Sequence, residues 1–130
     1  EIAEQVSRSL KAKFREGYVS SRDKAVHFES LSIEGKKELF QKDKNYGKVI
    51  CRCELVTLAE ILDSIRRPLG ARTVDGVKRR TRAGSGRCQG GFCSPRIVEI
   101  LAKELGKDLR EIVKSSEKST YLIGLDKELL

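Results

Sequence analysis

The chain has 130 residues, of which 38% are hydrophobic and 35% charged, and its 27 Lys and Arg outnumber 19 Asp and Glu to give a formal charge of +8. This length supports one compact domain and excludes a large catalytic one. No apolar run reaches the length of a membrane span and no signal-peptide pattern opens the chain, which argues against a transmembrane or secreted protein and favours the cytoplasm.

Residues 1–47 are expected to form a linker and helical extension. Apolar side chains recur every four residues at the start of the chain, which predicts a short amphipathic helix. These apolar residues are Ile2, Val6, Leu10 and Phe14. Residues 17–29 show no such period and are typical of a loop. Ser32 is the expected N-cap of a second helix that ends near Asn45, and residues 48–50 then run extended into the first cysteine.

Residues 48–114 carry the strongest helix signals and predict a small all-α domain with four helices. The expected N-caps are Thr57, Thr73, Ser94 and Asp108. The first and last of these have Glu three residues later, as in a capping box, and a proline follows the third. The expected helix ends lie near Pro68, Gly84, Gly106 and Val113. No segment predicts a pair of strands, and residues 115–130 form a polar C-terminal tail.

The entire net positive charge of the chain lies between Arg66 and Arg96. This stretch holds nine basic residues against one acidic residue, Asp75, whereas the rest of the chain is balanced. The basic residues are Arg66, Arg67, Arg72, Lys78, Arg79, Arg80, Arg82, Arg87 and Arg96. Clustered positive charge is typical of a surface that faces solvent, a nucleic acid or another anionic group.

Four cysteines flank and enter this basic stretch. Cys51 and Cys53 form a C-x-C pair, and Cys88 and Cys93 form a C-x4-C pair. In an extended segment Cys51 and Cys53 face one side while Arg52 faces away. Both pairs lead toward helix N-termini, which favour thiolates. A disulfide within C-x-C would be strained and nothing indicates an oxidising compartment, so a metal site is favoured.

Two metals suit four cysteines. The C-x-C spacing is tighter than the usual zinc pairs, whereas an x4 spacing occurs in plant-type ferredoxins. A 2Fe–2S cluster with four thiolates carries a net charge of about −2, which the basic stretch offsets. These features favour 2Fe–2S, with zinc as a substitute, and no catalytic residue is predicted. A zinc-stabilised basic helical module that binds nucleic acid remains the alternative.

Four segments together resemble a known family. They are residues 50–54 (ICRCE), 65–73 (IRRPLGART), 75–84 (DGVKRRTRAG) and 86–93 (GRCQGGFC). They are similar to the 2Fe–2S domain of the bacterioferritin-associated ferredoxin type, in the version at the C-terminus of FAD-dependent oxidoreductases such as anaerobic glycerol-3-phosphate dehydrogenases. The resemblance covers residues 46–106. Because the chain begins at Glu1 and lacks Met, we expect a piece of a longer protein.

The resemblance implies a helix-turn-helix iron–sulfur domain in which Cys51, Cys53, Cys88 and Cys93 match the ligand positions one for one. It also implies FAD in an upstream part of the same polypeptide and single-electron transfer through the cluster to an unknown acceptor. The chain alone is not expected to turn over substrate, and no nucleic-acid partner is implied. The x4 pair is longer than that of the free-standing ferredoxin, which argues against a bacterioferritin partner.

Overall fold

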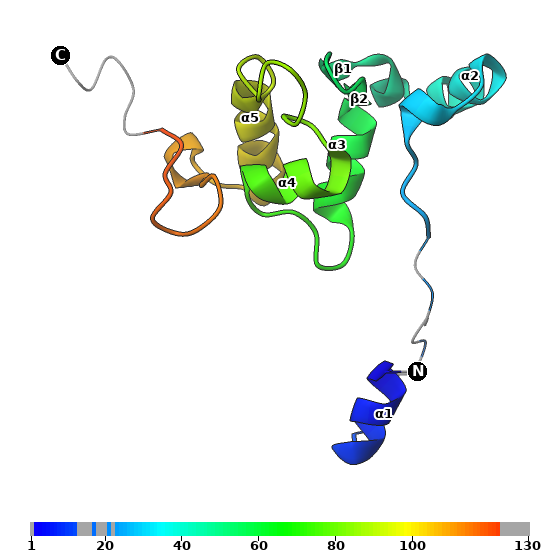
Figure 1. Ribbon diagram of the computed structural model, residues 1–130, viewed down its shortest axis with the longest axis vertical. Coiled ribbons are helices and arrows are strands. Elements are labelled where there is room, and N and C mark those ends of the chain that lie inside the picture. Colours follow the sequence, from blue (N-terminus) through cyan, green and yellow to red (C-terminus); the bar gives the residue numbers. More distant parts are fainter. Residues whose placement is uncertain (1, 13–16, 18–20, 22, 123–130) are drawn as a thin grey trace.

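The computed structural model describes residues 2–12, 17, 21 and 23–122, and it is mostly helical (Figure 1). The helices are α1 (Ile2–Ser9), α2 (Ile33–Lys42), α3 (Leu58–Arg66), α4 (Val74–Thr81) and α5 (Ser94–Leu105). Three 3-10 turns span Phe28–Ser30, Lys44–Gly47 and Leu109–Glu111. The two strands are β1 (Val49–Cys51) and β2 (Val56–Thr57). None of the described helices is both long and apolar enough to cross a membrane.

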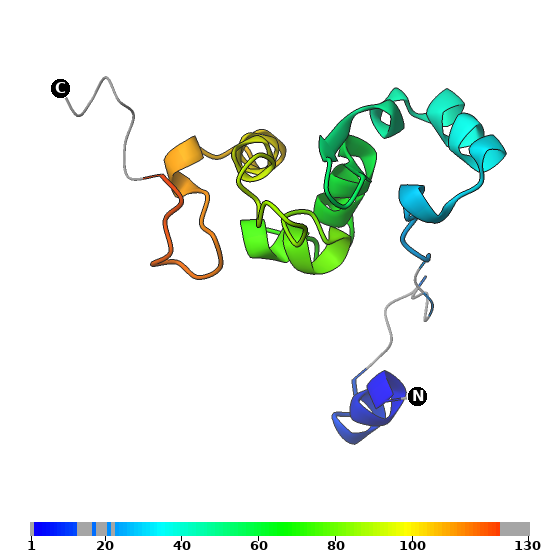
Figure 2. The same cartoon turned by 45° about the horizontal axis from the view of Figure 1, so that its top comes forward.

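The core lies where α3, α4 and α5 pack against one another, as both ribbon views show (Figures 1 and 2). Each helix contributes an apolar stripe, and the largest wholly buried side chains come from these stripes. They include Ile61, Ile65, Val77, Ile97 and Leu101. Burying each such side chain stabilises the fold by about 1.5–3 kcal/mol.

Local hydrogen bonds start the helices, in part as expected. The Thr57 side chain accepts from the backbone of Glu60 while the Glu60 carboxylate accepts from the Thr57 N–H at 2.8 Å, which confirms the capping box. The Thr73 side chain caps α4 by accepting from the Gly76 N–H at 3.0 Å, without a reciprocal bond. Helix α5 differs, because its N-cap is Cys93 and Ser94 is already helical. The Ser94 N–H donates to the carbonyl of Gly90, so α5 begins one residue earlier than predicted.

The expected fourth helix is shorter than predicted. Asp108 does start it with a capping box, but only the 3-10 turn Leu109–Glu111 follows. Gly106 ends α5 as predicted, in the left-handed conformation with φ of 63°.

A small antiparallel sheet corrects the all-α expectation. Val49 pairs with Thr57 and Cys51 with Val56, with an irregular register between the two pairs. The intervening turn places Leu55 at a φ of 50°. The extended segment expected at residues 48–50 corresponds to β1. Strands of three and two residues are too short to produce an alternating apolar pattern, so the sequence shows no signal for their pairing.

The segment before α2 lies against α3. The backbone N–H of Phe28 donates to the Glu60 carboxylate at 3.1 Å, and the Arg67 guanidinium donates to the carbonyl of Asp23 at 2.7 Å. The Phe28 ring stacks on that of Tyr46, with centroids 6.0 Å apart. Part of the expected loop is therefore tied to the helical core.

Helix α1 ends at Ser9, so it is shorter than the predicted amphipathic segment. Its apolar side chains are exposed, and Ile2 retains 79% of its accessible surface. Phe14, predicted to continue the stripe, lies outside the described residues.

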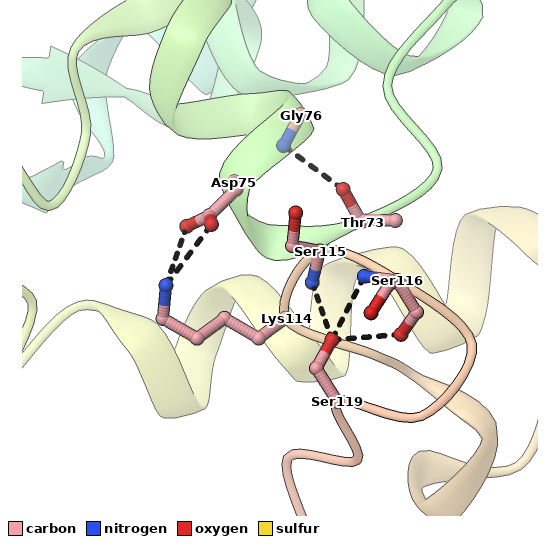
Figure 3. A network of polar contacts seen from close by, with 7 residues as sticks. All are labelled: Thr73, Asp75, Gly76, Lys114, Ser115, Ser116 and Ser119. Carbon is pink, nitrogen blue, oxygen red and sulfur yellow. Dashed lines mark hydrogen bonds and ion pairs between the residues drawn. The ribbon is translucent and has the colours of Figure 1, made fainter.

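The chain after α5 folds back onto the start of α4. The N–H groups of Val74 and Asp75, which have no partner within a helix, donate to the carbonyls of Val113 and Lys114 at 3.2 and 2.8 Å. The Lys114 ammonium also forms an ion pair with the Asp75 carboxylate at 3.0 Å (Figure 3). The first turn of α4 is thus stabilised by a segment 39 residues away in sequence.

One serine side chain closes the turn that follows (Figure 3). The Ser119 hydroxyl accepts from the backbone N–H groups of Ser115 and Ser116 and donates to the Ser116 carbonyl. The same turn allows the Lys114 N–H to donate to the Ser119 carbonyl at 2.8 Å. Residues 115–119 of the expected tail therefore form a defined turn.

Candidate metal centre

The four cysteines come from two segments and line one pocket. Cys51 ends β1 and Cys53 lies in the turn to β2, whereas Cys88 lies in the loop after α4 and Cys93 caps α5. The pocket has a volume of about 500 Å³. Its lining residues are Ile50, Cys51, Arg52, Cys53, Arg87, Cys88, Phe92, Cys93 and Arg96. The structure therefore brings together all four predicted site residues.

The sulfurs are arranged as an inner and an outer pair. Cys51 and Cys93 are both buried, with 1% of their surface exposed. Cys53 is exposed and Cys88 is half-buried, and their Sγ atoms lie 3.6 Å apart. Each pair takes one cysteine from each segment, so a group bound here would join the C-x-C turn to the loop before α5.

The surroundings shift the two thiols of the second segment in opposite directions. Backbone N–H groups of Phe92 and Gly90, with smaller contributions from Cys53 and Gly91, lower the pKa of the Cys88 thiol. Burial, followed by the neighbouring Cys51, raises the pKa of the Cys93 thiol to about 11. Burial therefore favours the protonated form of the Cys93 thiol at neutral pH.

Two glycines allow close packing around the second cysteine segment. A Cβ at Gly86 would lie only 2.3 Å from the Cβ of Cys53. A Cβ at Gly90 would lie 2.4 Å from the Ser94 hydroxyl, and Gly90 also has a φ of 88° that side chains disfavour. The lack of a side chain at Gly86 therefore lets the loop contact the C-x-C turn, whereas the lack of one at Gly90 lets the loop fold against the start of α5.

Arginines surround the pocket, and one of them is placed differently from the prediction. Strict alternation puts Arg52 on the side away from the cysteines, but Arg52 lines the same pocket. The alternation stops because Cys53 lies in a turn and not in the strand. Arg82 lies nearby and forms an ion pair with Glu54 at 2.7 Å, which holds the loop after α4 against the C-x-C turn.

The donor set fits an iron–sulfur cluster. Four thiols and nearby backbone N–H groups are the ligands and hydrogen-bond donors that hold a 2Fe–2S cluster. Within the described part of the chain, no three or more His, Cys, Asp or Glu residues are gathered around a point where a single metal ion could bind. The four sulfurs instead occupy two pairs across one pocket. Nothing in the described residues supports zinc as a substitute.

Comparison with known proteins agrees with this donor set. Residues 49–103 match the family described as the BFD-like [2Fe-2S] binding domain, and this range contains all four cysteines. Residues 49–103 belong to that family. The BFD-like domain thus spans β1 to α5, from the C-x-C turn to the last turn of the core helix. No solved structure matches the chain.

Relatives of the BFD-like domain include large dehydrogenase chains. Glycerol 3-phosphate dehydrogenase from Caloramator mitchellensis is 51% identical over 124 residues, which cover 95% of this chain and 25% of the relative. Anaerobic glycerol-3-phosphate dehydrogenase subunit A1 from Haloferax volcanii is 41% identical over 56 residues, covering 43% of this chain and 9% of the relative. Hydrogen cyanide synthase subunit HcnB from Pseudomonas aeruginosa is 47% identical over 53 residues, which cover 38% of this chain and 11% of the relative. The chain therefore spans about a quarter or less of these relatives.

Proposed function

We propose that this chain is the electron-transfer part of an FAD-dependent dehydrogenase of the glycerol-3-phosphate type. The observation that carries the proposal is the convergence of four cysteines from two segments in one pocket of the BFD-like domain. Cys51, Cys53, Cys88 and Cys93 would hold a 2Fe–2S cluster. Such a cluster accepts and donates one electron at a time.

The residues of this chain would perform three tasks. The buried pair Cys51 and Cys93 anchors the cluster to β1 and α5, while Cys53 and Cys88 hold its outward side. The N–H groups of Phe92 and Gly90, which lower the pKa of the Cys88 thiol, would favour the added negative charge of the reduced state. The surrounding arginines favour that charge as well.

Because the relatives are much longer than this chain, each part of the chain is assigned a role within a larger polypeptide. Residues 48–114 would form the cluster domain, residues 1–47 would join it to an upstream flavoprotein part, and residues 115–130 would follow as a tail. FAD bound in that upstream part would take a hydride from the substrate and release its electrons singly. A reducing cytoplasm keeps the thiols free for iron.

A nucleic-acid module has less support. Several arginines of the basic stretch are used within the fold and do not form a free surface. Arg66 and Arg67 bind carboxylates of α5 and α3, Arg72 donates to the Ile65 carbonyl, and Arg80 donates to the Leu69 carbonyl.

Spectroscopy of anaerobically reconstituted protein tests the proposal. We expect visible charge-transfer bands that bleach with dithionite, a rhombic spin-half EPR signal, and about two irons and two sulfides per chain. Single Cys→Ser variants at positions 51, 53, 88 and 93 should lose or alter the signal. The matched control Ser85→Ala, in the same loop, should retain it. A colourless protein that takes up only zinc contradicts the proposal.

A further inference from the structure

Three arginines and one phenylalanine form an exposed rim around the cysteine pocket, here called the Phe92 face. It consists of Arg52, Arg87, Phe92 and Arg96, all of which line the pocket. Phe92 keeps 84% of its surface exposed, and all three arginines are exposed. An exposed aromatic side chain among arginines is the composition typical of a protein interface.

The three arginines of this face differ from several other cations of the chain. Within the described residues, the side chains of Arg52, Arg87 and Arg96 make no hydrogen bond or ion pair. By contrast, four other basic side chains pair with carboxylates inside the fold. These pairs are Arg66–Glu104, Arg67–Asp63, Arg82–Glu54 and Lys114–Asp75. Three guanidinium groups without a partner among the described residues thus gather where the pocket opens.

The same face is where electrons could leave. The outer sulfurs of Cys53 and Cys88 are accessible, whereas those of Cys51 and Cys93 are covered by the core. A partner that contacts Phe92 therefore approaches the outer sulfurs without any rearrangement of the helices. The three positive charges would attract a carboxylate-bearing surface and would orient it over the pocket.

We propose that the Phe92 face is the docking surface for a redox protein with an acidic surface, which takes the electron from the cluster. This inference rests on the proposed electron-transfer function. The expected partner carries clustered carboxylates around an accessible redox group. Binding should be strong at low salt and should weaken as salt screens the charges.

Binding of poly-L-glutamate to the reconstituted protein tests the charge complementarity. The test variant is R52Q/R87Q/R96Q, and the control K37Q/R79Q/K107Q removes the same number of exposed positive charges outside the pocket lining. Isothermal titration calorimetry at low salt should show affinity for the polymer about tenfold weaker in the test variant. The control should stay within about twofold of wild type. The EPR signal of each variant shows whether the cluster is intact.

The outcomes separate the two proposals. Equal weakening in both variants, or none in the test variant, overturns the docking face even when the EPR signal is normal. A test variant that binds normally but has a lower reduction potential shows that the arginines only compensate cluster charge. Tighter binding of duplex DNA through the same arginines identifies a nucleic-acid partner instead. Loss of binding in the full-length polypeptide shows that its flavin part covers the face. Absence of the EPR signal in wild type refutes the electron-transfer function itself.

Discussion

Gly86→Ala is expected to disturb the packing of the cysteine loop against the C-x-C turn. The new Cβ would lie 2.3 Å from the Cβ of Cys53 and 3.2 Å from a Glu54 carboxylate oxygen. Carbon atoms in contact lie about 3.5–4.0 Å apart, so the loop or the C-x-C turn must move by about 1.2 Å or more. Overpacking of this kind costs about 1–3 kcal/mol. The movement also separates Cys53 from Cys88.

Two measurements check this prediction. Urea unfolding of the metal-free protein should give a free energy of unfolding lower by about 1–3 kcal/mol. Iron and sulfide content after reconstitution should fall below that of wild type. The control Gly35→Ala lies inside α2, where a Cβ meets only ordinary contacts at 3.6 Å, and it should stabilise by about 0.5–1 kcal/mol. A Gly86→Ala protein with wild-type stability and full iron content would refute the steric reasoning.

Three further substitutions test contacts outside the pocket. Glu60→Ala removes a buried carboxylate that caps α3 and accepts from the preceding segment, and should lower the free energy of unfolding by about 1–3 kcal/mol in a urea titration. Ser119→Ala should cost about 1 kcal/mol and speed amide hydrogen exchange in the turn it closes; unchanged exchange would count against this role. The Arg66 guanidinium, which binds both oxygens of Glu104, lowers the pKa of that carboxyl. The pair therefore stabilises above the ordinary Glu pKa of about 4.3 and loses this contribution as pH falls below it. Glu104→Gln should remove about 0.5–1 kcal/mol at pH 7 and progressively less as the pH falls below the ordinary Glu pKa, and a loss that does not change with pH would disprove the ion pair.

The parts of the fold that depend on neighbouring residues were predictable from the sequence. The Thr57 capping box, the Thr73 cap and the Gly106 end of α5 each involve residues within four positions of one another. Such hydrogen bonds form wherever the local chain turns into a helix, so the residue types alone indicate them. The convergence of the cysteines was also predictable, because both pairs precede helix starts.

Other features depend on contacts between distant segments. The donation from Phe28 to Glu60 spans 32 residues, and that from Asp75 to the Lys114 carbonyl spans 39. Neither contact has a local pattern, because a backbone N–H or carbonyl is present at almost every position. The placement of Arg52 in the pocket likewise follows from the turn after β1. The sequence does not predict this turn, because β2 has only two residues and gives no strand pattern.

The pairing of one cysteine from each segment has a consequence for chain entropy. A cluster held by Cys53 and Cys88 would act as a covalent staple across the 34 residues between them, which contain α3 and α4. Closing a loop of this length removes unfolded-state freedom worth about 4 kcal/mol at 25 °C. That figure approaches the lower end of the total stability of folded domains, about 5–15 kcal/mol. The cluster would then both transfer electrons and stabilise the fold. Its oxidative loss would end electron transfer and would also remove the cross-link that encloses α3 and α4.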